Sequence, residues 1–283
     1  MTDTHPLPFG AAPVPSSDTE LESRIRALLA SLAQPGVRGL DGAHVVAVLD
    51  GADIASLRVD ATGVTVDDDR LSRVRITAPS VDVTRRDPGT IRTLEVTAHP
   101  ASVMGVRADV DIAARDLHFD WAFGSDDQLY VEVRPPSDST PAVGTARIAA
   151  AHKDIVAAAR TALAGILRSK GFTLTALDLT VRNDGPRALT VRADAKVAKA
   201  FLRAGVTVTA SASIDRSLVL DVADVKMSGS NPVVEGLIAP FRSKISAASD
   251  RRIDLAAQLP AGVTVSDVSV VAGEEVVVTV TLG

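Results

Sequence analysis

Residues 187–227 alternate apolar and polar side chains through three successive runs, and no other feature of this chain constrains its fold as strongly. The runs occupy residues 189–197, 206–214 and 218–222. Side chains on a β-strand point to opposite faces with a period of two, so each run predicts a strand with one aliphatic face and one polar face. A turn at Asp215 separates the last two runs. The sequence therefore predicts an antiparallel meander that is covered on one side only.

A second region of alternation, residues 54–133, predicts further strands. Its longest run extends from Val106 to Trp121 and would cover roughly 50 Å at about 3.3 Å per residue, far more than a usual strand. The alternation changes phase after Asp116 and also at Gly63, as it does at a β-bulge. A strand of this length with a bulge is typical of a curved sheet that wraps around other elements.

Three helices are expected from runs in which apolar residues recur about every 3.6 positions. The first begins at Ser17 or Asp18, whose side chains can cap free amides, and ends at Pro35-Gly36. The second lies within residues 149–169, and the third begins at Pro232. Strands follow the first two helices, which indicates a diverged internal duplication.

The predicted fold class is α+β, with long curved antiparallel β-sheets in two helix-plus-meander repeats wrapped around helices. Residues 1–17 contain four prolines among small residues, a composition that predicts a disordered N-terminal arm. The first half is expected to cover residues 18–140 and the second residues 141–283. The two halves are expected to form one continuous structural unit.

Composition excludes several classes of protein. The chain has no cysteine, which removes disulfides, thiolate zinc sites and cysteine nucleophiles together. Its net charge of −5 gives no basic footprint for nucleic acid, so nucleic-acid binding is not expected. No secretory signal and no uncharged apolar stretch of transmembrane length is visible. The expected location is cytoplasmic, with peripheral contact to a membrane.

The sequence contains no catalytic or cofactor signature. The five histidines form no pair at i, i+4 spacing, and the acidic triplet at residues 67–69 is more typical of a hairpin turn than of a calcium loop. No serine lies in a G-x-S-x-G elbow, and no glycine-rich phosphate loop occurs. Arg85-Arg86 and Arg251-Arg252 are able to meet phosphate groups, but such pairs are usually only solvated. We therefore expect no enzyme, no metal and no cofactor.

The excess of aliphatic faces indicates a binding role. Helices and strands carry long Val, Leu, Ile and Ala stripes, whereas aromatic residues make up only 3% of the chain. A long curved sheet wrapped on a helix can enclose a tunnel with the smooth apolar lining that acyl chains need. The candidate groove residues on the second and third helices are Ile155, Ala159, Leu163, Ile166, Leu237, Ile238 and Phe241. The alternative is that these residues fill an ordinary core in a structural or assembly protein that recruits a protein partner.

A further pattern is carried by residues 144–172, by residues 206–227, and by LPAGVTV at residues 259–265 with Val268 and Val270. Together these segments resemble the LmeA-like phospholipid-binding family of actinobacteria. The resemblance implies a tubular lipid-binding fold, in which long antiparallel strands and a helix enclose a hydrophobic groove for phospholipid or another acyl-chain ligand. It also implies a role in maintaining cell-envelope lipid and offers no catalytic residues. Members are usually exported or membrane-anchored, whereas this sequence has no visible signal or anchor.

Overall fold

The computed structural model describes residues 6–32, 36–67, 81–137, 139–169, 171–199, 202–230, 251–256 and 263–283. The chain divides into two compact units. Unit 1 comprises residues 1–148, 260–266 and 279–283, and unit 2 comprises residues 149–259 and 267–278. The division after Ile148 lies later in the chain than the expected boundary at residue 140, and the C-terminal strands contribute to both units.

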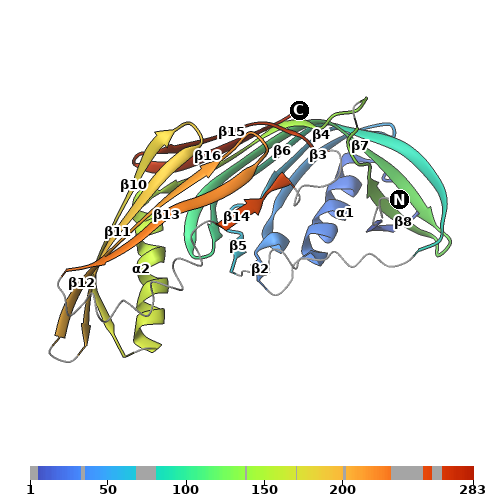
Figure 1. The fold of residues 1–283 in the computed structure, drawn as a ribbon. Coiled ribbons are helices and arrows are strands. Elements are labelled where there is room, and N and C mark those ends of the chain that lie inside the picture. Colours follow the sequence, from blue (N-terminus) through green and yellow to red (C-terminus); the bar gives the residue numbers. More distant parts are fainter. Residues whose placement is uncertain are drawn as a thin grey trace. The chain divides into compact units, whose positions relative to one another are not determined.

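The described part of unit 1 consists mainly of strands that accompany the α-helix α1 (Figure 1). Its elements are β1 (Leu7–Ala11), α1 (Asp18–Ser31), β2 (Val37–Arg38), the 3-10 helix η1 (Leu40–Gly42), β3 (His44–Asp50), β4 (Asp53–Asp60), β5 (Thr65–Val66), β6 (Val83–Val103), β7 (Val106–Gly124) and β8 (Gln128–Val133). Three further strands belong partly to this unit: β9 (Val143–Ala151), β15 (Val265–Ala272) and β16 (Glu275–Leu282). The sheet order is β15-β16-β9-β7-β6-β4-β3, with β1, β2, β5 and β8 pairing off this path.

The expected long strand is present as β7, which has 19 residues and pairs antiparallel with the 21 residues of β6. The bulge that the sequence predicts near Asp116 is absent. Thr93 faces Arg115 and Ile91 faces Leu117, so no residue is inserted there. Asp116 instead adopts a positive φ of 53°, which an aspartate tolerates better than most residues. The phase of the alternation therefore changes without a shift of register.

The sheet is not antiparallel throughout, which corrects the prediction. Both β4 and β5 pair in parallel with β6. Gly63, expected to mark a bulge within one strand, lies between β4 and β5 with a φ of 87°. A period of two is common to parallel and antiparallel strands, so alternation alone could not distinguish the two pairings.

Helix α1 and the strands around it form a packed core. The Ser17 side chain accepts a hydrogen bond from the Glu20 amide at 3.3 Å, which confirms the predicted N-cap. Leu21 is fully buried on the inner face of the helix. The Trp121 ring lies edge-on to Phe119 with centroids 4.8 Å apart, and its Nε1 donates to the Ala52 carbonyl at 2.9 Å. Unit 1 therefore has the dense interior of an ordinary globular domain.

The N-terminal segment is more ordered than the sequence predicts. Leu7–Ala11 forms β1, which pairs antiparallel with β8, and the Phe9 side chain is buried against Trp121 at a centroid distance of 5.4 Å. The expectation of a disordered arm is therefore wrong for residues 7–11. Proline content predicts an extended chain. Burial of the Phe9 side chain offsets the conformational entropy that residues 7–11 lose when they become ordered.

Among the described strands, β3 ends the sheet order and pairs with β4 alone, so it is an edge strand of the described sheet. Two carboxylates of α1 cover its free amides. Glu22 accepts from the Ala47 amide at 3.2 Å, and Asp18 accepts from the Leu49 amide at 2.7 Å. Such contacts satisfy the edge and disfavour pairing with another chain.

Strands β7 and β8 also hold two buried acidic side chains, which the sequence analysis did not identify. Asp120 and Glu132 face each other across the two strands. Arg134 binds Asp120 through two nitrogens, and Arg86 binds Glu132 at 2.7 and 3.1 Å. The bonds to Glu132 raise the pKa of Arg86 above its usual value, so the guanidinium stays charged. Each buried carboxylate thus has its own half-exposed arginine.

Unit 2 contains one described helix, α2 (His152–Ser169), and a five-stranded antiparallel sheet. The strands follow chain order: β10 (Thr173–Gly185), β11 (Ala188–Lys199), β12 (Leu202–Ile214), β13 (Val219–Gly229) and β14 (Arg251–Asp254). β11, β12 and β13 confirm the predicted antiparallel meander. The third expected helix, from Pro232, lies outside the described residues. Neither α1 nor α2 has the length and apolarity that a membrane-crossing helix requires.

Candidate functional site

Helix α2 carries four of the seven predicted groove residues. It begins at His152 because residues 143–151 form β9, and it ends where the sequence indicates. Gly171 adopts a φ of 76° after the last turn, and its amide donates to the Arg168 carbonyl at 3.0 Å, as a glycine exit requires.

The predicted stripe on α2 is only partly covered. Ile155, Ala159 and Leu163 are half-buried, and Ile166 is 62% exposed. No residue of α2 is fully buried, in contrast to Leu21 and Ile25 on α1. Three further predicted groove residues, Leu237, Ile238 and Phe241, lie outside the described residues.

The aliphatic face of the meander is also half-buried. Strand pairing aligns its side chains in rows across the sheet, one of which consists of Leu179, Ala193, Val208 and Met227. Every member of this row has intermediate exposure. α2 contacts β10, at one edge of the sheet. A row inside a packed core would be excluded from water almost completely.

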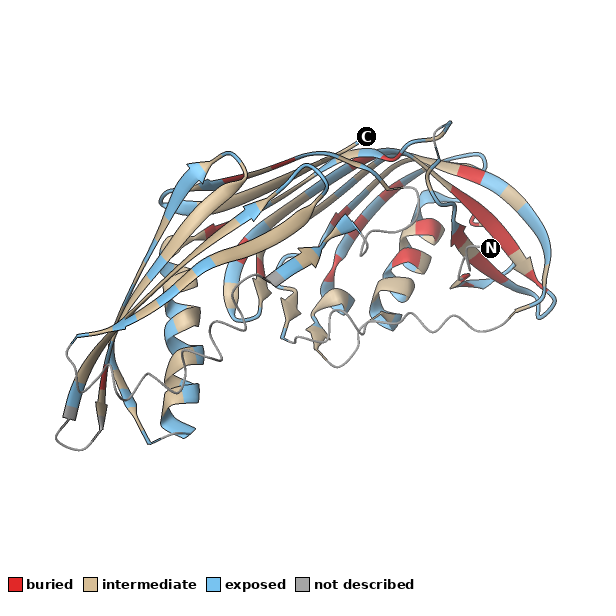
Figure 2. Cartoon of the chain, in the orientation of Figure 1, coloured by how far each residue is buried: buried red, intermediate tan, exposed pale blue. Residues whose placement is uncertain are grey.

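Burial therefore differs between the two units. Most of the buried apolar side chains among the described residues belong to unit 1, and Figure 2 shows unit 2 largely in the intermediate and exposed classes. The exceptions in unit 2 are Ala149, Ala150, Val197, Val268 and Val270. The meander and α2 thus present apolar side chains that other parts of the chain cover incompletely.

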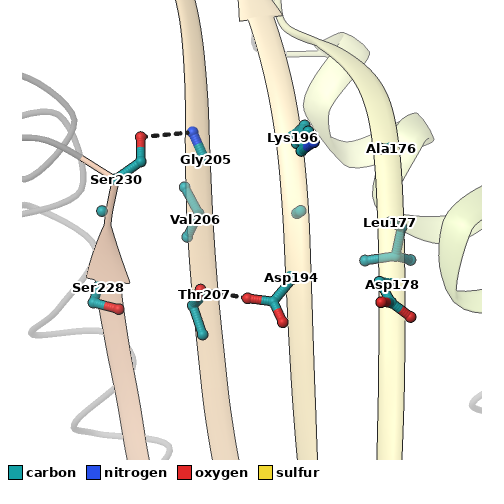
Figure 3. A pocket seen from close by; sticks show the side chains of 12 residues that line it. Ala176, Leu177, Asp178, Asp194, Lys196, Gly205, Val206, Thr207, Ser228 and Ser230 are labelled. Carbon is teal, nitrogen blue, oxygen red and sulfur yellow. Dashed lines mark hydrogen bonds between the residues drawn. The ribbon is translucent and has the colours of Figure 1, made fainter.

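A pocket of about 370 Å³ crosses strands β10–β13 (Figure 3). Its lining residues are Ala176, Leu177, Asp178, Asp194, Ala195, Lys196, Gly205, Val206, Thr207, Ser228, Gly229 and Ser230. Asp178, Asp194 and Thr207 lie in one row across the sheet. Bonds from Arg192 and Thr207 hold the pKa of Asp194 below its usual value. That carboxylate is a poor general base, because such a base needs a pKa near the working pH.

Sequence reasoning missed this polar row, because the row depends on register. Asp178 and Asp194 are distant in sequence, and only the pairing of β10 with β11 places them opposite each other. The signal available beforehand was weak, since each residue was one polar position in an alternating run.

Other polar clusters in the described chain lack the parts of a catalytic site. His99 Nε2 lies 2.6 Å from Asp111, which also lies 3.4 Å from Arg147, but all three side chains are substantially exposed. Tyr130 donates to Asp126 at 2.8 Å and lowers the pKa of that carboxyl. Among the described residues, no group of three or more potential ligands is positioned to hold a metal ion.

Comparisons with protein-family models, with curated proteins and with solved structures find no match to this chain. The resemblance to the LmeA-like family therefore stays a prediction from the sequence. Function has to be inferred from the geometry of the two units.

Proposed function

We propose that this protein is a non-enzymatic lipid carrier that holds a phospholipid or a similar acyl-chain ligand. The acyl chains lie against the apolar stripe of α2 and the aliphatic face of β10–β13. The observation that carries the proposal is the difference in burial. Side chains fill the interior of unit 1, whereas the stripe and the face in unit 2 are only half-buried. An apolar ligand would complete the burial that unit 2 lacks.

Apolar contacts of this kind supply enough free energy to bind an acyl chain without specific hydrogen bonds. Each buried methylene contributes about 0.8 kcal/mol, so ten methylenes supply on the order of 8 kcal/mol before the cost of ordering the chain. A surface of aliphatic side chains with few aromatic rings suits flexible ligands, because such a surface is smooth.

The proposal includes the fold family and the biological setting. We infer that α1 with its strands and α2 with its strands are diverged copies of one helix-plus-meander repeat of the tubular lipid-binding kind. The order of elements supports this, since a helix precedes long strands in both units. The link to cell-envelope lipid rests on the resemblance of residues 144–172, 206–227 and 259–265 to the LmeA-like family.

Protein purified without detergent is expected to release phospholipid on organic extraction, as identified by mass spectrometry. Leu163→Glu places a carboxylate in the stripe and should reduce the retained lipid at least about tenfold, because an unpaired charge against an acyl chain costs well over 1.4 kcal/mol. Thr161→Glu adds the same charge at an exposed position of α2 and should leave retention unchanged. Equal retention by the two variants, or no uptake of phospholipid by delipidated protein, would contradict the proposal.

A scaffold or assembly protein is the second candidate. It is favoured by the exposed side chains of Val46 and Val48 on β3, which are 42% and 44% exposed, and by the filled core of unit 1. Lipid-free protein that is compact and recovers one reproducible partner in pull-downs would support this candidate instead. Loss of that partner on Val46→Ser/Val48→Ser would locate the contact.

A further inference from the structure

Helix α2 has a second stripe beside the apolar one, and this stripe is cationic. It consists of Lys153, Arg160 and Arg168, all exposed. At 100° per residue these three positions fall within an arc of about 80°, which lies about 60° around the helix from Leu163. Asp154 is the only acidic residue on α2.

Ion pairing distinguishes these cations from those of unit 1. Most described arginines of unit 1 pair with carboxylates, and Arg107 and Arg115 are the exceptions. None of the three cations on α2 forms an ion pair within the described part of the chain. The charge of the cationic stripe is therefore available to an external partner.

The exposed apolar residue on the same helix narrows the class of that partner. Ile166 lies within the apolar stripe yet is 62% exposed, so the rest of the chain leaves this side chain largely uncovered. Figure 2 shows α2 itself in the exposed and intermediate classes, with no buried residue. A helix with cations on one face and an exposed apolar residue on another has the character of helices that lie in a bilayer interface.

We propose that the cationic stripe of α2 docks the protein on an anionic lipid bilayer. The chain as a whole carries a net charge of −5, so an anionic membrane repels it unless one local surface has the opposite sign. The unpaired stripe supplies that surface, and the exposed Ile166 on the apolar face of the same helix can enter the interface. This docking rests on the proposed function, because it brings the lipid-holding face of unit 2 to a source of lipid.

The test is co-sedimentation of the full chain with vesicles of phosphatidylcholine alone or with phosphatidylglycerol added. Binding is expected with the anionic vesicles, and it should weaken as salt rises. Arg160→Gln/Arg168→Gln should weaken it by about 30-fold, from roughly fivefold for each cation near an anionic surface. Arg107→Gln/Arg115→Gln removes the same charge from exposed unpaired arginines of β7 and should leave binding within about twofold of the unchanged protein.

Equal weakening by the two double variants would overturn the proposal, because net charge rather than α2 would then be responsible. Equal binding to neutral and anionic vesicles, or no binding to either, would also overturn it. Self-association without vesicles that Arg160→Gln/Arg168→Gln abolishes would assign the stripe to a second copy of the chain instead. Retained lipid is measured separately by extraction, so docking can fail while the carrier function stands, and the reverse.

Discussion

Leu21→Ala is expected to lower the free energy of unfolding by about 3 kcal/mol or more, whereas Leu163→Ala should cost only about 1 kcal/mol. Both leucines lie on helices, so the change in helix propensity is the same. Leu21 is fully buried between α1 and the strands of unit 1, and its truncation leaves a cavity. Leu163 is half-buried, so truncation removes less contact area and leaves no closed void.

Denaturant unfolding of delipidated protein, followed by circular dichroism, measures both costs. Emission from Trp121, the only tryptophan of the chain, reports unit 1 separately. Equal losses for the two variants would mean that the stripe of α2 is packed as tightly as the core around Leu21, and the proposed open face would not exist.

Arg86→Ala is expected to be the second most damaging change, lowering stability by about 2–3 kcal/mol. The side chain of Glu132 is 7% exposed and accepts two hydrogen bonds from Arg86. Without Arg86, Glu132 would remain opposite Asp120, which is paired with Arg134. We expect a smaller loss of stability than for a fully buried ion pair, because the Arg86 side chain is half-exposed and solvent partly screens its charge.

A double-mutant cycle separates this effect from simple loss of packing. Arg86→Ala/Glu132→Leu removes the buried charge together with its partner and should recover most of the lost stability. A double variant as unstable as Arg86→Ala alone would show that the aliphatic part of the arginine side chain, rather than the ion pair, is what matters.

Local patterns predicted those elements whose signal is contained within one segment. The alternation of residues 189–222 and the length of β7 are properties of single strands, and the cap at Ser17 is a property of one helix start. The pairing of β4 with β6 could not be predicted, because alternation does not specify strand direction. β1 was missed because proline content indicated disorder, while the burial of Phe9 depends on residues far along the chain.

For the candidate site, the sequence predicted which residues share a face of the helix but not how far they are buried. Ile155, Ala159, Leu163 and Ile166 share one stripe of α2 because helical periodicity is local. Their degree of burial was not predictable, since it depends on what the rest of the chain places against them. The same pattern on α1 gives a filled core around Leu21, so periodicity does not distinguish a covered stripe from an open one.

The most direct test of the central claim is photo-crosslinking with a phospholipid that carries a diazirine within its acyl chain. After irradiation and proteolysis, the labelled peptides are identified by mass spectrometry. Labels should concentrate in residues 152–169 and 173–229, on α2 and the strands of the meander. Labels confined to peptides of unit 1, or spread evenly along the chain, would contradict the assignment of acyl chains to the aliphatic face of unit 2.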